Sequence, residues 1–179
     1  MNLYLCGMIG SGKTTLGRAL SVRLKSPFLD LDGEMNRRLG YSFHRLVRER
    51  GWLPFRELEY SICKAFAAVH GAVVCLGGGT VRYEWNRDVL SGTGVMVLLE
   101  ADEDTLIERV RAADRPRVNP GTDVAGDIRR MWADHCGTYR AAADVIYRTD
   151  EKSIREEVRE LEMLIRDDRR FASLRGHLV

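Results

Sequence analysis

The residues best suited to chemistry lie near the amino terminus, in the segment Gly7–Thr14. Its order, a glycine, four residues and then Gly-Lys-Thr, is the phosphate-binding P-loop pattern. Glycines allow backbone N–H groups to converge on phosphate oxygens, and the amino end of a following helix adds a favourable dipole. The Lys13 ammonium would reach the β- and γ-phosphates, and the Thr14 hydroxyl would bind Mg²⁺. We therefore expect the chain to bind a nucleoside triphosphate together with Mg²⁺.

Two aspartates, Asp30 and Asp32, end a short segment that begins at Phe28 and is predicted to be a strand. In an open parallel sheet, ligands gather at the carboxyl ends of the strands, so both carboxylates would face the phosphate site. Their spacing of two places both side chains on one side if the strand continues through them. The alternative is that Asp32 only caps the helix that starts beside Gly33.

Further along the chain, an arginine and a glycine triplet indicate an anionic substrate. Arg56 follows an aromatic residue and precedes Glu59 by three positions, so it could be an oriented anion clamp, although alone it would be a surface arginine. The triplet Gly77–Gly79 removes side chains where a ligand must approach the backbone. A flexible turn is the alternative, but two residues would suffice for it.

The segment 114–121 is polar, rich in proline and glycine, and has arginines in its first half. This composition predicts a mobile lid rather than a core element. An arginine in such a lid could close onto the transferring phosphate and exclude water. An ordinary basic surface loop is the alternative.

The elements that must position these residues alternate between strands and helices. Short apolar runs predict the strands, and apolar spacing of three and four predicts the helices, with Ser42, Pro54 and Asp102 near helix starts. Because strands and helices alternate, the expected fold class is α/β with a parallel sheet. The expected strands are 2–6, 28–32, 72–76, 94–99 and 144–147, and the expected helices are 13–25, a broken stretch over 34–70, 83–91, 102–112, 124–142 and one around 154–165.

Composition favours one globular domain over residues 1–179. The hydrophobic fraction is 45%, the charged fraction is 30%, and the net charge of +2 is too small to indicate a nucleic-acid surface. No apolar run is long enough to cross a membrane. The four cysteines are scattered, which favours reduced thiols in a cytoplasmic protein, and we expect a monomer. Within this domain we expect a substrate-binding helical segment at about 33–60, a lid at about 113–123, and a fraying tail at about 167–179.

The order of these motifs resembles the signature of shikimate kinases from about residue 3 to about residue 150. The P-loop alone is shared by many enzymes, whereas the four later motifs together are far more specific. The resemblance implies a P-loop three-layer fold, with a five-stranded parallel sheet flanked by helices and a mobile lid. It also implies transfer of the γ-phosphoryl group of ATP to the 3-hydroxyl of shikimate. The motifs are the P-loop, Phe28-x-Asp30-x-Asp32, Phe55-Arg56-x-x-Glu59, Gly77-Gly78-Gly79 and Arg115-Pro116.

The resemblance also implies roles for individual residues. Thr14 would ligate Mg²⁺, with Asp30 supporting the metal through water, and Asp32 would hold the attacking hydroxyl and could accept its proton. Arg56 would pair with the substrate carboxylate, because a planar fork matches two oxygens. Arg115 would come down with the lid, and either Arg109 or Arg111 would stack on adenine. The nucleotide would contact Gly10, Ser11, Gly12, Lys13, Thr14, Thr15 and Arg115; the substrate would contact Asp32, Arg56, Gly78, Gly79 and His135; and the catalytic residues would be Lys13, Asp32 and Arg115.

One departure from the family pattern concerns the helix after the lid. Where the family has an arginine that forms a second clamp on the shikimate carboxylate, this chain has His135. A neutral imidazole has one donor, so the loss could weaken binding by about 1.5–3 kcal/mol. Arg140 lies more than a turn further on and is expected to face elsewhere. Either shikimate binds less tightly, another group compensates, or the acceptor is another small hydroxy acid such as gluconate; a non-catalytic nucleotide-binding module is a further alternative.

Overall fold

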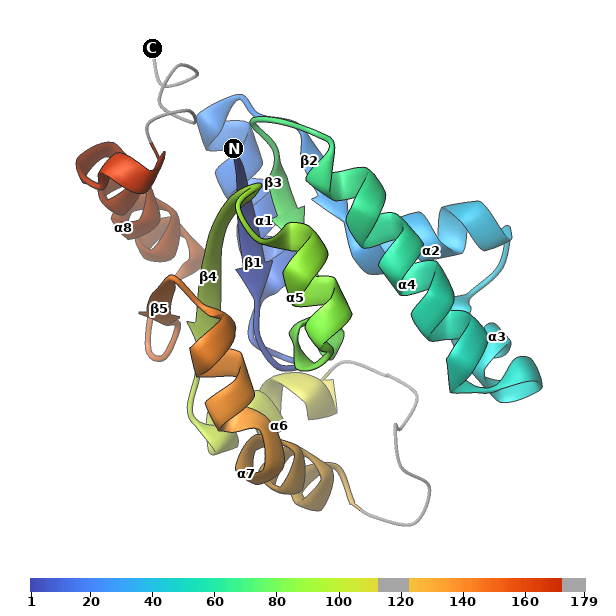
Figure 1. The fold of residues 1–179 in the computed structure, drawn as a ribbon. Coiled ribbons are helices and arrows are strands. Elements are labelled where there is room, and N and C mark those ends of the chain that lie inside the picture. Colours follow the sequence, from blue (N-terminus) through green and yellow to red (C-terminus); the bar gives the residue numbers. More distant parts are fainter. Residues whose placement is uncertain (113–122, 172–179) are drawn as a thin grey trace.

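The computed structural model describes residues 1–112 and 123–171. Within them, five parallel strands form one sheet in the order β2-β3-β1-β4-β5, with helices on both faces (Figure 1). This confirms the predicted α/β fold with a five-stranded parallel sheet. The expected lid, including Arg115, falls outside the described residues. The strands are β1 (Asn2–Cys6), β2 (Phe28–Asp30), β3 (Val73–Cys75), β4 (Gly94–Glu100) and β5 (Val145–Arg148).

The helices begin and end close to the predicted positions. Ser42 caps its helix by accepting a hydrogen bond from the His44 N–H at 3.3 Å, and Asp102 does the same for the Thr105 N–H at 2.9 Å. The helices are α1 (Lys13–Leu24), α2 (Leu31–Leu39), α3 (Phe43–Arg50), α4 (Trp52–Ala67), α5 (Glu84–Leu90), α6 (Glu103–Ala112), α7 (Val124–Ala142) and α8 (Ile154–Asp167), with 3₁₀ turns η1 (Thr80–Arg82) and η2 (Arg169–Phe171). Among the described helices, none combines the length and apolarity needed to span a membrane.

The central strands are buried on both faces because helices cover each side. In β1, Leu3 and Leu5 pack into one core cluster, whereas Tyr4 and Cys6 pack into the other. This alternation follows from the two-residue period of a strand. Helices α1 and α8 cover the first face, and α4, α5 and α7 lie on the opposite face (Figure 1). The parallel arrangement brings the carboxyl ends of the strands to one edge, where the candidate residues gather.

Two sequence-based expectations are wrong in detail. The second strand ends at Asp30 rather than continuing through Asp32, because the Asp30 carboxylate accepts a hydrogen bond from the Gly33 N–H at 2.8 Å and starts α2. Asp30, and not Asp32, is therefore the helix cap. The first residues of the expected fraying tail are ordered as far as Phe171, because its ring is fully buried in the cluster beneath α1 and α8.

Candidate active site

The P-loop connects β1 to α1 and depends on glycine for its shape. Gly7 has φ +141°, and a Cβ there would lie 2.5 Å from the Leu99 carbonyl oxygen. Gly10 has φ +83°, and its Cβ would lie 2.9 Å from a methyl group of Val110. Both the backbone angle and the close neighbours exclude larger side chains. The glycines therefore fix the loop between the end of β4 and helix α6.

The ammonium of Lys13 is held at the centre of this loop. Its Nζ donates to the carbonyl oxygens of Gly7 and Met8 at 2.9 and 2.8 Å, and lies 3.4 Å from the Ser11 hydroxyl. Lys13 is only 9% exposed, so its charge is concentrated at the loop rather than on the open surface. The predicted phosphate-binding lysine therefore lies among the backbone groups that would surround a phosphate.

Two predicted metal ligands, Thr14 and Asp30, lie together at the start of α1 and the end of β2. The Thr14 hydroxyl donates to one Asp30 carboxylate oxygen at 2.9 Å. Both are hard oxygen ligands, which Mg²⁺ prefers. In the described part of the chain, no three His, Cys, Asp or Glu residues cluster as a complete protein cage. Mg²⁺ usually takes only one or two protein ligands and completes its shell with phosphate and water, so this pair fits it.

The glycine triplet after β3 lies between the P-loop and the aspartates. A Cβ on Gly78 would lie 3.4 Å from the backbone nitrogen of Ile9, within the P-loop. A Cβ on Gly77 would lie 3.2 Å from a carboxylate oxygen of Asp32. Asp32 thus reaches the site from the first turn of α2, although the predicted strand does not extend to it. The triplet therefore contacts both the P-loop, which is predicted to bind the nucleotide, and Asp32, which is predicted to bind the acceptor.

Arg56 is held in a fixed position beside the glycine triplet. Its Nη1 pairs with the Glu59 carboxylate at 2.7 Å, and the arginine side chain is 15% exposed. Its guanidinium carbon lies 4.2 Å from the centre of the Tyr83 ring and 5.2 Å from that of Trp52. Ion pairing and stacking restrict the planar fork to one orientation. Arg56 is therefore largely buried and held in one orientation, which is the geometry that the predicted anion clamp requires.

The partner of Arg56, the buried Glu59, organises a network that the sequence did not reveal. One of its oxygens accepts from the Thr80 hydroxyl at 2.8 Å, and the other accepts from Arg56 and from the Asn86 amide at 3.1 Å. Glu59 is 1% exposed, so its charge needs these donors. The network ties α4 to η1 and α5. Asn86 and Thr80 gave no signal, because each is a single polar residue without a motif.

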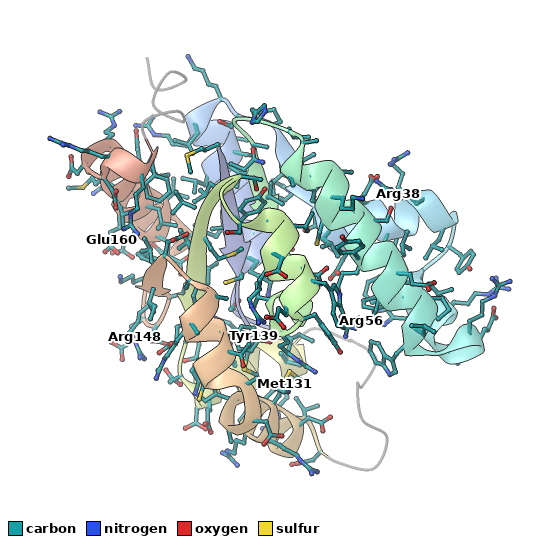
Figure 2. All side chains as sticks on the ribbon, viewed as in Figure 1. Arg38, Arg56, Met131, Tyr139, Arg148 and Glu160 are labelled. Atoms are coloured by element: carbon teal, nitrogen blue, oxygen red, sulfur yellow. The ribbon has the colours of Figure 1, made fainter. Side chains whose placement is uncertain are left out.

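Helix α7 approaches the triplet through Tyr139, whose hydroxyl donates to the Gly78 carbonyl oxygen. Burial raises the pKa of Tyr139 to about 12, which keeps this donor protonated. In Figure 2, Arg56 on α4 and Tyr139 on α7 lie on either side of the lower end of α5. His135, one turn earlier, is half-buried. Burial and the nearby charge of Arg82 lower the pKa of His135, so its imidazole is neutral at pH 7.

The structure places Arg109, Arg111 and Arg140, the other arginines considered for the site, in different surroundings. Arg140 pairs with Glu100 at 2.8 Å and faces away from the triplet, as predicted. Arg109 donates to the Thr149 carbonyl oxygen at 3.0 Å and lies 3.5 Å from the Gly10 carbonyl oxygen, so it lies beside the P-loop. Arg111 lies on the exposed side of α6 instead. Of the two adenine-stacking candidates, Arg109 is therefore the one near the nucleotide side.

Comparisons with known proteins give one consistent family. The family model described as Shikimate kinase matches residues 9–166. The shikimate kinase of Symbiobacterium thermophilum is 35% identical over 164 residues, which cover 90% of this chain and 94% of the relative. That of Pseudomonas aeruginosa strain LESB58 is 36% identical over 165 residues, with the same coverage of 90% and 94%. The solved structure of shikimate kinase from Acinetobacter baumannii in complex with shikimate superposes with a TM-score of 0.84, at 27% identity and 94% coverage of both chains.

Proposed function

Because the chain belongs to the shikimate kinase family, we propose that it transfers the γ-phosphoryl group of ATP to the 3-hydroxyl of shikimate. The products are ADP and shikimate 3-phosphate. The observation that carries this proposal is that the glycine triplet lies against the P-loop, Asp32 and Arg56 at once. The groups proposed to bind phosphate, accept the proton and bind the carboxylate thus all lie next to the same three glycines. The use of ATP and the free cysteines support a cytoplasmic location.

On the nucleotide side, the chain supplies positive charge and fixed donors. Phosphoryl transfer needs positioning and charge neutralisation more than covalent chemistry. Lys13 and the backbone N–H groups of the P-loop hold the β- and γ-phosphates. Thr14 and Asp30 would hold Mg²⁺, which when bound would offset negative charge on the phosphate oxygens. Arg109 packs near the adenine, and Arg115 from the segment after α6 adds charge at the γ-phosphate.

On the acceptor side, Arg56 pairs with the shikimate carboxylate and Asp32 orients the 3-hydroxyl. The hydroxyl oxygen forms the new P–O bond as the bond between the γ-phosphorus and the bridging oxygen breaks. Its proton passes to the Asp32 carboxylate, and the electron pair of the broken bond remains on ADP. The backbone of Gly78 and Gly79 leaves room for the ring beside these groups.

A coupled assay of ADP release tests the proposal directly. With ATP, Mg²⁺ and shikimate the protein should produce ADP and shikimate 3-phosphate in equal amounts, and gluconate should give only the background rate. ¹H–³¹P NMR of the product would establish which hydroxyl is phosphorylated. Nucleotide binding without turnover at millimolar shikimate would contradict the proposal and indicate a non-catalytic module.

A further inference from the structure

Two arginines from different elements converge on Gly79. A Cβ on Gly79 would lie 3.6 and 3.7 Å from the two terminal nitrogens of Arg56, which comes from α4. The same Cβ would lie 3.8 Å from a terminal nitrogen of Arg82, the last residue of η1. Both guanidinium groups therefore border the same small volume above the third glycine. Arg82 is part of no motif in the sequence.

The charges around Gly79 do not balance. The buried carboxylate, Glu59, pairs with Arg56 and uses its other oxygen for Thr80. Among the residues that the structure describes, Arg82 makes no ion pair with a carboxylate. The buried Nε atoms of both Arg56 and Arg82 lack a hydrogen-bond partner there. Buried donors of this kind normally find an acceptor, so two unpaired donors and an excess cation indicate a place for an anion.

The chemistry of α7 shows why the second cation has to come from η1. Helix α7 packs against η1, so Arg82 lies close to His135 and Tyr139 where α7 faces the triplet. Burial, together with the charge of Arg82, lowers the pKa of His135. His135 is neutral there and offers one donor, whereas Arg82 offers a charged fork. The three arginines of α7 are already paired: Arg129 with Glu103, Arg130 with Asp134, and Arg140 with Glu100.

We propose that Arg82 is the second carboxylate-binding residue of the acceptor site and acts with Arg56 on the carboxylate of shikimate. This inference rests on the proposed function. A carboxylate has two oxygens and about four lone-pair sites, enough for one fork from each arginine. In this chain, His135 stands where the family resemblance implies an arginine, and the second positive charge comes from Arg82 on η1. Two guanidinium groups, rather than one, border the acceptor site, so the site favours an acid as acceptor.

The test compares Arg82, at the end of η1, with Arg87, in the following helix α5, in the full-length protein. Arg82→Met should raise the KM for shikimate by about 10- to 100-fold, with little change in kcat or in the KM for ATP. The control is Arg87→Met, because Arg87 donates to the Val81 carbonyl oxygen at 2.8 Å and supports η1 without reaching Gly79. It should leave the KM for shikimate within a few-fold of wild type. Shikimate methyl ester provides the second readout, because Arg82→Met should lose much of the wild-type preference for the acid.

A rescue experiment separates charge from structure. His135→Arg should change the wild-type KM little, but in the Arg82→Met background it should recover about tenfold, since it restores a second cation beside the triplet. If Arg82→Met does not fold, Arg82→Gln is measured in its place and should show the same loss of preference for the acid.

Equal KM values for the Arg82 variant, the Arg87 variant and the wild type would overturn the inference while leaving the proposed function intact. A wild-type protein that does not phosphorylate shikimate would instead overturn the proposed function, and the inference with it.

Discussion

The carboxylate of Glu59 offers the sharpest test of how this site is held together. It is 1% exposed and accepts from Arg56 at 2.7 Å, Thr80 at 2.8 Å and Asn86 at 3.1 Å. Glu59→Gln keeps the shape of the side chain but removes its charge. The glutamine oxygen can still accept from Arg56 and Asn86, and its NH₂ can donate to the Thr80 hydroxyl, which is able to reverse its role. The variant therefore isolates the charge of the buried pair.

The magnitude follows from the burial of both partners. Removing one member of a buried pair typically costs 3–5 kcal/mol, because the remaining charge is left uncompensated. Glu59→Gln retains the hydrogen bonds and Arg56 is 15% exposed, so we expect the free energy of unfolding to fall by about 2–3 kcal/mol. The KM for shikimate should rise as well, because Arg56 loses the partner that orients its fork.

Urea unfolding followed by circular dichroism measures the effect. The midpoint for Glu59→Gln should fall while the slope stays unchanged. Glu49→Gln is the matched control, since Glu49 forms the same kind of pair with Arg45 at 2.8 Å, but with the side chains 57% and 49% exposed. That variant should unfold almost where the wild type does. If the two variants unfold at the same urea concentration, burial is not what makes the Glu59 pair important and the reasoning is refuted.

Three further predictions concern the chemistry, the nucleotide and pH. Asp32→Asn should lower kcat by roughly 10²- to 10⁴-fold with little change in the KM for ATP, measured by ADP release; an unchanged kcat would exclude Asp32 as the proton acceptor. Arg109→Met should raise the KM for ATP several-fold and Arg111→Met should not, because only Arg109 lies beside the P-loop; equal values would contradict the assignment. Burial raises the pKa of Glu157 from 4.5 to about 7, so the folded protein holds this proton more tightly than the unfolded chain and loses stability as the pH rises through that window. Glu157→Gln should therefore be more stable than wild type at pH 8, by at most about 3 kcal/mol, but not at pH 4. If the difference in urea midpoint between the variant and the wild type is the same at both pH values, the raised pKa of Glu157 is disproved.

Much of this architecture is predictable from the sequence because local patterns determine it. The P-loop pattern predicts its own strand, turn and helix, and the apolar runs locate the five strands to within two residues. Asp32 shows the limit of this reasoning. The segment 28–32 is predicted to be one strand with Asp32 at its end, but the Asp30 side chain caps α2 by accepting from the Gly33 N–H, and the chain turns into α2. A local side-chain hydrogen bond therefore ends the strand at Asp30.

The acceptor side was less predictable because its contacts join distant parts of the chain. Arg82 follows the glycine triplet in a single 3₁₀ turn, where no helical or strand period indicates its direction. Its relation to Arg56 and to α7 depends on how three separate elements pack. The family resemblance indicated that an arginine is absent at position 135, whereas Arg82 became a candidate to replace it only because the fold brings it beside Gly79.

The hydrogen bond from Tyr139 to Gly78 has a consequence for how this enzyme can diversify. Tyr139 and its neighbour Arg140 anchor α7 at two points, so the alignment of the helix over the triplet does not depend on the residue at position 135. If Arg82 binds the carboxylate as proposed, positions 82 and 135 could exchange their side chains while the scaffold stays in place. Selectivity among small organic acids would then be adjustable at these two positions, without rebuilding the phosphate-binding half of the molecule.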